Sequence, residues 1–170
     1  MANVEIHTVD PKREELDRFY MSEAMKEARL AAEEGEVPVG AVIVRDGEII
    51  ARGRNTREYG KTALGHAEIS AIGDACKRLG GWRLTRCTMY VTMEPCPMCA
   101  GAIISARIPR VVSAVKDAKA GAFGSVINLN SYPLNHKVET DFGVLSEEAT
   151  EMVGDFFKKL RESLRGKGKS

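Results

Sequence analysis

The stretch of sequence that decides the fold covers residues 89–115, which read MYVTMEPCPMCAGAIISARIPRVVSAV. Its pattern predicts a short buried strand over residues 89–92, a helix over 96–106 and a second strand over 110–115. A strand, a helix and a strand in this order imply a right-handed crossover between neighbouring parallel strands. The stretch therefore indicates an α/β fold.

The sequence before this stretch predicts a helix and a hairpin. Asp10-Pro11 is typical of a helix start, and small and apolar residues recur at helical spacing until Gly35, where we expect the helix to end. Residues 39–44 and 48–54 predict two strands joined at Asp46-Gly47. Tight hairpin turns favour this dipeptide because both of its positions need a positive φ.

Two further helices complete the predicted layers. One begins near His66 and ends at Gly80-Gly81, and the last begins at Ser146 after a loop-rich segment. The residues of the first that we expect to face the core are Ile69, Ile72, Ala75, Cys76 and Leu79. Since no repeat or linker divides the chain, we expect one domain over residues 1–170 with a frayed basic tail at 166–170. The predicted fold is a three-layer α/β/α sandwich with a central mixed sheet.

Composition narrows the class of protein. The chain has 170 residues, of which 44% are hydrophobic and 29% charged, and its formal net charge is only +1, which does not by itself indicate a nucleic-acid partner. The longest nearly apolar run, residues 37–44, is too short to cross a bilayer, and residues 1–17 hold no apolar signal segment. We therefore expect a soluble cytoplasmic protein with no membrane partner and no framework disulfides.

Candidate metal ligands open two of the predicted helices. His66 opens one, and Cys96 and Cys99, three residues apart on one helix face, open the next. The positive end of a helix favours thiolates, the form of cysteine that binds zinc. Two thiolates and one imidazole would occupy three corners of a tetrahedral zinc site and leave the fourth for water. An open corner is typical of catalytic zinc.

Glu68 is the candidate catalytic residue. Zinc lowers the pKa of its water from 15.7 towards about 7, but a proton must still reach the substrate ring and the leaving amine. Residues two apart on a helix point in different directions, so Glu68 can face the water while His66 binds the metal. The combination H-x-E…P-C-x-x-C is the signature of the zinc-dependent base deaminases.

The same residues allow other interpretations. A Cys-x-x-Cys pair alone would also fit a structural zinc half-site or a thiol redox pair. A non-enzymatic, zinc-stabilised binding module would need a fourth protein ligand, for which Cys76, Cys87 and His136 are the candidates. We predict that Cys76 and Cys87, which lack a Cys-x-x-Cys partner, are buried unreactive thiols, and that His136 lies outside the metal site.

Further motifs extend over nearly the whole chain. They are EVPVGAV (36–42), Asn55, HAEI (66–69), YVTMEPCPMCAGA (90–102), DAK (117–119), Asn135-His136 and DFF (155–157). Together they resemble the bacterial tRNA-specific adenosine deaminases of the zinc-dependent cytidine/deoxycytidylate deaminase superfamily. The resemblance implies a cytidine deaminase-like fold, one zinc ion per subunit, and hydrolytic deamination of adenosine to inosine at the wobble position of a tRNA anticodon.

The resemblance also implies roles for individual residues. Zinc hydroxide would attack C6 of adenine while Glu68 protonates N1 and then the leaving ammonia. The residues implied in substrate binding are Asn55, which would hydrogen-bond the flipped base, Ala67, Asp117, Asn135 and Phe157, and those implied at the RNA backbone are Lys119, Lys158, Lys159 and Arg161. The partner would be a tRNA anticodon stem-loop, and the protein a homodimer.

The C-terminal segment has two interpretations. Residues 158–170 carry a local excess of five positive charges, which suits binding of a tRNA stem. A charged helix end that is simply solvated would give the same pattern, so charge alone does not separate the two.

Two segments depart from the family's pattern. Thr62-Ala63-Leu64-Gly65 stands where the family commonly has Asp-Pro-Thr-Ala, and Ser113-Ala114-Val115-Lys116 replaces the usual Phe-Gly-Ala pattern. Both segments flank the predicted substrate mouth and leave the metal residues unchanged. The main alternative is therefore a deaminase of free bases or nucleosides of the cytosine or guanine type, since the same zinc chemistry serves small substrates on related folds.

Overall fold

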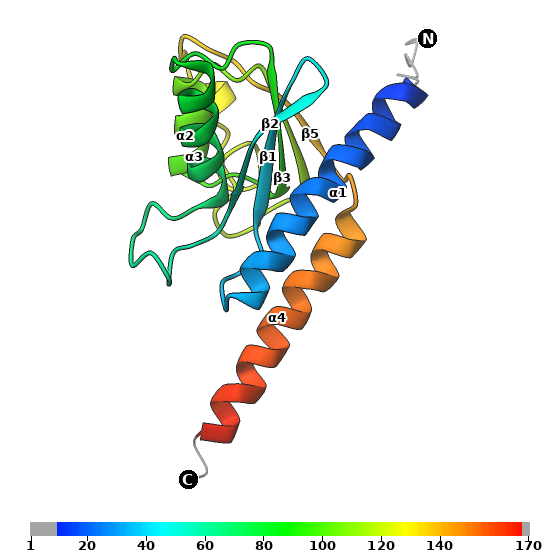
Figure 1. The fold of residues 1–170 in the computed structure, drawn as a ribbon, viewed down its shortest axis with the longest axis vertical. Coiled ribbons are helices and arrows are strands. Elements are labelled where there is room, and N and C mark those ends of the chain that lie inside the picture. Colours follow the sequence, from blue (N-terminus) through cyan, green and yellow to red (C-terminus); the bar gives the residue numbers. More distant parts are fainter. Residues whose placement is uncertain (1–9, 168–170) are drawn as a thin grey trace.

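The computed structural model describes residues 10–167 as three layers around a five-stranded sheet (Figure 1). Helices α2 and α3 cover one face of the sheet, and α1 and α4 lie on the other. In chain order the elements are α1 (Pro11–Glu33), β1 (Gly40–Arg45), β2 (Glu48–Arg54), α2 (Ala67–Leu79), β3 (Cys87–Met93), α3 (Pro97–Ser105), β4 (Arg110–Val115), a 3-10 turn (Leu129–Ser131), β5 (Glu139–Phe142) and α4 (Ser146–Lys167). The predicted α/β/α sandwich is confirmed.

The sheet is mixed, as predicted, with the strand order β2-β1-β3-β4-β5. Strand β1 pairs antiparallel with both β2 and β3, whereas β3, β4 and β5 run parallel to one another. The hairpin turn has the predicted geometry, since Asp46 and Gly47 have φ angles of 51° and 79°. Strand β5 was not predicted, because its four residues ETDF include an exposed Glu139 and three partly buried residues and show no alternation of apolar and polar side chains.

Two glycines allow helices on both faces to approach the sheet closely. A Cβ atom at Gly53 of β2 would lie 2.2 Å from the carbonyl oxygen of Ala67, at the start of α2. A Cβ atom at Gly40 of β1 would lie 2.2 Å from the carbonyl oxygen of Ala24 in α1. Real Cβ atoms essentially never come within 3.0 Å of such atoms, so glycine at these positions fixes the depth at which each helix packs.

The core face of α2 differs in part from the prediction. The residues buried against the sheet are Ala67, Ala71 and Ala75, and Ile72, Cys76 and Leu79 pack at their margin. Ile69 was expected in the core but is only partly buried and lies outside the core cluster, because it is two residues from both Ala67 and Ala71 and therefore points away from the face that they bury. Cys87 is buried as predicted, whereas Cys76 is only partly buried.

A buried ion pair ties α1 to the sheet. The Arg110 guanidinium donates to both carboxylate oxygens of Asp17, at 2.8 and 2.6 Å, and the Tyr90 hydroxyl donates to the same carboxylate at 2.7 Å. The side chains of Asp17 and Arg110 are 9% and 13% exposed. This two-point geometry fixes the angle of α1 over β3 and β4.

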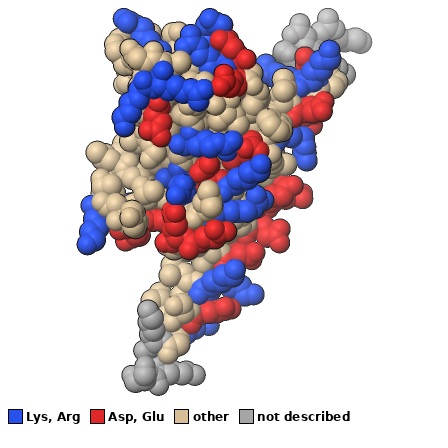
Figure 2. Space-filling model, in the orientation of Figure 1, with Lys and Arg blue, Asp and Glu red and all other residues tan. Residues whose placement is uncertain are grey.

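Helix α4 continues past the body of the protein (Figure 1). It ends at Lys167, so Gly166 and Lys167 are helical, contrary to the predicted fraying of 166–170, while residues 168–170 lie outside the described part of the chain. Acidic and basic side chains are interspersed over the face that carries α1 and α4 (Figure 2). Among residues 10–167, none of the helices combines the length and the apolar character that a membrane span needs.

Candidate active site

The topology brings the starts of α2 and α3 to one edge of the sheet. Strands β2 and β3 are both antiparallel to β1, so they run in the same direction and end at the same edge. The chain enters α2 at His66 and α3 at Cys96, which are the N-cap residues of the two helices. Residues thirty positions apart in sequence therefore face each other.

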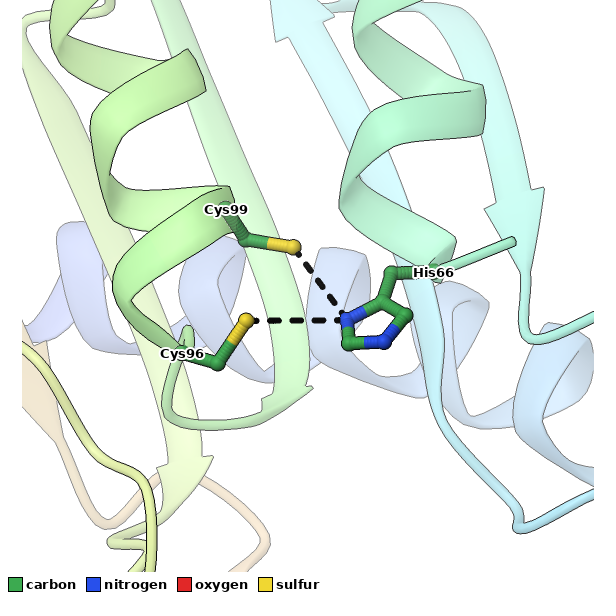
Figure 3. A group of neighbouring side chains, drawn as sticks. All are labelled: His66, Cys96 and Cys99. Carbon is green, nitrogen blue, oxygen red and sulfur yellow. Dashed lines mark hydrogen bonds between the residues drawn. The ribbon is translucent and has the colours of Figure 1, made fainter. Parts of the chain in front are cut away.

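The three predicted metal ligands converge at this edge (Figure 3). The Nδ1 atom of His66 lies 3.6 Å from the Sγ atom of Cys96 and 3.5 Å from that of Cys99, and all three donor atoms lie within 4.8 Å of one another. In a tetrahedral zinc site with bonds of about 2.1 Å to nitrogen and about 2.3 Å to sulfur, a nitrogen and a sulfur ligand lie about 3.6 Å apart. The donor set and its spacing therefore fit zinc.

Hydrogen bonding and burial change the pKa values of the two cysteine thiols. A hydrogen bond from the Cys99 side chain lowers the pKa of Cys96 to about 5, although burial opposes this shift. The same hydrogen bond, together with burial, raises the pKa of Cys99. One sulfur is thus readily ionised, and a bound cation would favour ionisation of the second.

A cavity of about 220 Å³ adjoins the metal ligands. It is lined by Val37, Val39, Asn55, Arg57, His66, Ala67, Glu68, Met93, Glu94, Cys96, Asp117 and Ala120. Glu68 is 4% exposed, and burial raises the pKa of its carboxyl group. The cavity is small compared with sites for drug-sized ligands, which suits a single flat ring rather than a large substrate.

Of the predicted substrate residues, the structure brings Asn55, Ala67 and Asp117 to this cavity. Asn55 donates from Nδ2 to the carbonyl oxygen of Val37 at 3.2 Å and accepts from the amide of Arg57 at 3.1 Å. These bonds hold the Asn55 amide in one orientation and leave one N–H group and one lone pair for a ligand. Asp117 accepts from the amides of Lys119 and Ala120.

The other predicted residues lie outside the cavity lining. Asn135 is exposed, and the His136 ring is bonded through Nε2 to the carbonyl oxygen of Ile108 at 2.8 Å rather than directed at the metal ligands. Phe157 is 38% exposed on α4, where its ring meets that of Phe156 edge to face. The predicted RNA-backbone residues Lys119, Lys158, Lys159 and Arg161 are also absent from the lining.

Two buried acidic residues were not predicted: Glu94, which lines the cavity, and Glu36, which precedes the lining residue Val37. Glu36 is 1% exposed and accepts the amides of Glu58 and Tyr59, while Glu94 is 2% exposed and accepts hydrogen bonds from the loop that follows β4. Glu36 lies in the stretch 36–42 and Glu94 in the stretch 90–102, but neither has a motif partner. The available signal was the position of Glu94, an acidic residue directly after a buried strand and two residues before a cysteine ligand.

The fold and the site together define a class of protein. A mixed five-stranded sheet, with a histidine and a Cys-x-x-Cys pair meeting at the starts of two helices and a buried glutamate beside them, is the arrangement of deaminases with the cytidine deaminase-like fold. The family model of MafB19-like deaminases matches residues 16–161.

Comparison with individual proteins narrows this class. The chain is 48% identical over 155 residues to a tRNA-specific adenosine deaminase of Bacillus subtilis (91% of this chain, 96% of that protein) and 45% identical over 147 residues to one of Aquifex aeolicus (86% and 97%). A solved structure from a study of A-to-I editing by tRNA:A34 deaminases superposes with a TM-score of 0.77 at 42% identity, covering 79% of this chain and 98% of that one. A guanine deaminase from Bacillus subtilis is more distant, with a TM-score of 0.55 at 33% identity over 69% and 85% of the two chains. The chain therefore belongs to the family of the tRNA-specific adenosine deaminases.

Proposed function

We propose that this protein hydrolytically deaminates adenosine to inosine at the wobble position of a tRNA anticodon. The observation that carries the proposal is the cavity in which the metal ligands His66 and Cys96 adjoin Glu68, Asn55 and Asp117. Relatives at 43–48% identity are tRNA-specific adenosine deaminases, which supports tRNA as the substrate. The proposed partner is the anticodon stem-loop, whose unpaired nucleotides can be turned out of the stack into the cavity.

The metal centre of the proposal is one zinc ion per subunit, held by His66, Cys96 and Cys99. Bound there, zinc would supply the Lewis acidity that makes water nucleophilic at neutral pH. The two sulfurs and the ring nitrogen already lie at mutual distances that suit this ion. None of the other cysteines or histidines among residues 10–167 belongs to this group of donors.

Glu68 is the proposed proton carrier. Its carboxyl group is buried and lines the cavity next to the metal ligands, so it can carry one proton from the attacking water to N1 of the base and a second proton, from the hydroxyl group formed at C6, to the departing amine. Ala67 and Asn55 also line the cavity and would hold the base in place. Val37, Val39 and Met93 give the cavity apolar surface against which a purine ring can pack.

RNA contacts outside the cavity are also part of the proposal. Asp117 stands at the cavity and would meet a nucleotide next to the target base, with Lys119 nearby on the same loop. Asn135 and Phe157 are exposed and could contact neighbouring nucleotides. The exposed residues Lys158, Lys159 and Arg161 follow Phe157 on the part of α4 that extends past the body, where Figure 2 shows basic side chains. Cations on this helix would meet phosphates of the stem.

A homodimer remains part of the proposal through the family resemblance. Light scattering coupled to size-exclusion chromatography would measure its mass directly. A species of twice 18.6 kDa supports the dimer, whereas a monomer at the concentrations used for activity would remove it.

A substrate panel tests the function. Zinc-loaded protein is incubated with an anticodon stem-loop that carries a wobble adenosine, and separately with free adenine, adenosine, cytosine and guanine, and products are identified by mass spectrometry. The matched control is Glu68→Ala, which should bind zinc but form no product. Inosine in the stem-loop alone supports the proposal. Product only from a free base, which the small cavity and the similarity to a guanine deaminase would explain, supports the alternative and refutes the proposal.

A further inference from the structure

The carboxylate of Glu94 lies buried between the cavity and the loop of residues 117–125. Glu94 follows directly after β3, and its main-chain amide donates to the carbonyl oxygen of Val115 at 2.9 Å, so its backbone is held at the end of β4. Its side chain is one of few buried acidic groups in the described chain, and no arginine or lysine pairs with it there. A buried carboxylate without a cationic partner must be stabilised by hydrogen bonds.

The loop supplies those hydrogen bonds. One oxygen of Glu94, Oε2, accepts the main-chain amide of Asp117 at 2.9 Å and the hydroxyl of Ser125. The other, Oε1, accepts the main-chain amides of Phe123 and Ser125 at 3.1 and 3.2 Å. Hydrogen bonds to an ionised acceptor are about twice as strong as neutral ones. The side chain of Glu94 therefore holds both ends of the loop of residues 117–125 through hydrogen bonds.

Gly121 shows how tightly the loop encloses this group. A Cβ atom at Gly121 would lie 2.4 Å from Cδ and from Oε2 of Glu94, and 2.6 Å from the carbonyl oxygen of Asp117. The amide of Gly121 donates to that same carbonyl oxygen at 2.9 Å. The loop thus closes around the carboxylate with space for a hydrogen atom and nothing larger.

The same loop carries part of the cavity wall. Asp117 and Ala120 line the cavity together with Glu94, and the two oxygens of Glu94 are already occupied by the loop. We propose that Glu94 is a positioning residue, whose carboxylate fixes the backbone of 117–125 and thereby sets where Asp117 meets the nucleotide beside the target base. The identity of the substrate in this inference rests on the proposed function, whereas the role of Glu94 in holding the loop does not.

Replacement by glutamine tests the acceptor requirement. Glutamine has nearly the same shape, but it places an NH₂ group where one oxygen stood. In either orientation of the amide, that NH₂ group faces at least one main-chain N–H of the loop, because each oxygen of Glu94 accepts at least one main-chain amide. Since two donors repel each other, Glu94→Gln cannot keep the loop in its present conformation.

The experiment combines kinetics with hydrogen exchange. For Glu94→Gln we expect KM for the stem-loop to rise about 10-fold or more with a smaller change in kcat, and the amides of 117–125 to exchange faster, while zinc content stays at the wild-type value. Ser125→Ala removes one hydroxyl donor and should raise KM by about 3-fold. Gly121→Ala keeps the carboxylate but displaces the loop, so it should also raise KM. It provides the test if Glu94→Gln does not fold.

The matched control is Asp17→Asn, which alters a buried hydrogen-bonded carboxylate that touches α1, β3 and β4 but not this loop. It should lower stability and leave KM and the exchange of 117–125 unchanged. Wild-type KM and exchange in Glu94→Gln, or the same KM change in Asp17→Asn, would overturn the proposal. If the wild-type protein does not act on the stem-loop, the proposed function fails. The exchange data would still decide whether Glu94 holds the loop.

Discussion

The substitution Gly53→Ala tests whether the depth of α2 against the sheet sets the geometry of the site. Its added Cβ would lie 2.2 Å from the carbonyl oxygen of Ala67 and 2.8 Å from the amide nitrogen of Ala71. Because both are main-chain atoms, no side-chain rotation relieves the overlap. Reaching a contact of 3.0 Å or more requires the first turn of α2 and the edge strand β2 to separate by about 1 Å.

That displacement acts directly on the site, because His66 and Glu68 flank Ala67. A misplacement of about 1 Å in a catalytic constellation can lower the rate about 100-fold, which corresponds to about 2.7 kcal/mol of transition-state stabilisation. We therefore expect kcat/KM on the anticodon stem-loop to fall about 100-fold and zinc content to fall with it. Overpacking of this kind also lowers the free energy of unfolding by about 1–3 kcal/mol.

The matched control is Gly73→Ala in the same helix, where the new Cβ meets nothing within 4 Å. It should leave kcat/KM unchanged and stabilise the helix by up to about 1 kcal/mol. Inosine formation is followed by mass spectrometry, metal by elemental analysis, and folding by circular dichroism. If folded Gly53→Ala retains kcat/KM within about 3-fold of wild type, or if Gly73→Ala loses as much activity, the depth of α2 does not set the geometry of the site.

Three further predictions concern other parts of the molecule. Asp17→Ala removes the two-point partner of the Arg110 guanidinium and leaves it with Asp141 and longer contacts to Tyr90 and Glu139, so urea denaturation should show a loss of about 3 kcal/mol of unfolding free energy; a loss below about 1 kcal/mol would contradict this. Burial raises the pKa of Asp17, but hydrogen bonds from Arg110 and Tyr90 outweigh burial and hold this pKa below its ordinary 3.8. The difference in unfolding free energy between wild type and variant should therefore be full above pH 3.8 and shrink as the pH falls further. A difference that does not change with pH would be inconsistent with the ion pair. Glu68→Gln should lower kcat by about 10²- to 10⁴-fold while bound zinc is retained, and near-normal kcat would exclude Glu68 as proton carrier. Gly154→Ala, on a helical position with nothing within 4 Å, should raise the thermal midpoint through a gain of about 1 kcal/mol, and a lower midpoint would show that this glycine has a packing role.

Local patterns in the sequence predicted most of the fold. The turn at Asp46-Gly47, the helix start at Asp10-Pro11 and the strands on either side of the Cys-x-x-Cys segment are each decided by residues close together in the chain, so periodicity and turn chemistry suffice. Strand β5 depends instead on pairing with β4, from Arg110 with Glu139 to Ser113 with Phe142. Its polar residues carry no local strand signal, so only the completed sheet specifies it.

The site residues also divide into those that local sequence patterns predict and those that they do not. The residues His66, Cys96 and Cys99 could be chosen in advance because helix starts and ligand spacing determine where their donor atoms lie, and the structure brings those atoms together. The roles of Glu36 and Glu94 could not be predicted, since their partners are main-chain amides of loops that carry no sequence pattern. Asn135 and Phe157 remain predictions from resemblance, because neither lines the cavity in the single chain.

The proposed function requires that His66, Cys96 and Cys99 are the complete set of protein ligands to one zinc ion, with a fourth position left for water. X-ray absorption at the zinc edge of the purified protein measures this set directly. We expect one zinc per chain with two sulfur and two light-atom neighbours. Three or four sulfur neighbours, which would require Cys76 or Cys87 as ligands, or active protein without a stoichiometric metal, would contradict it.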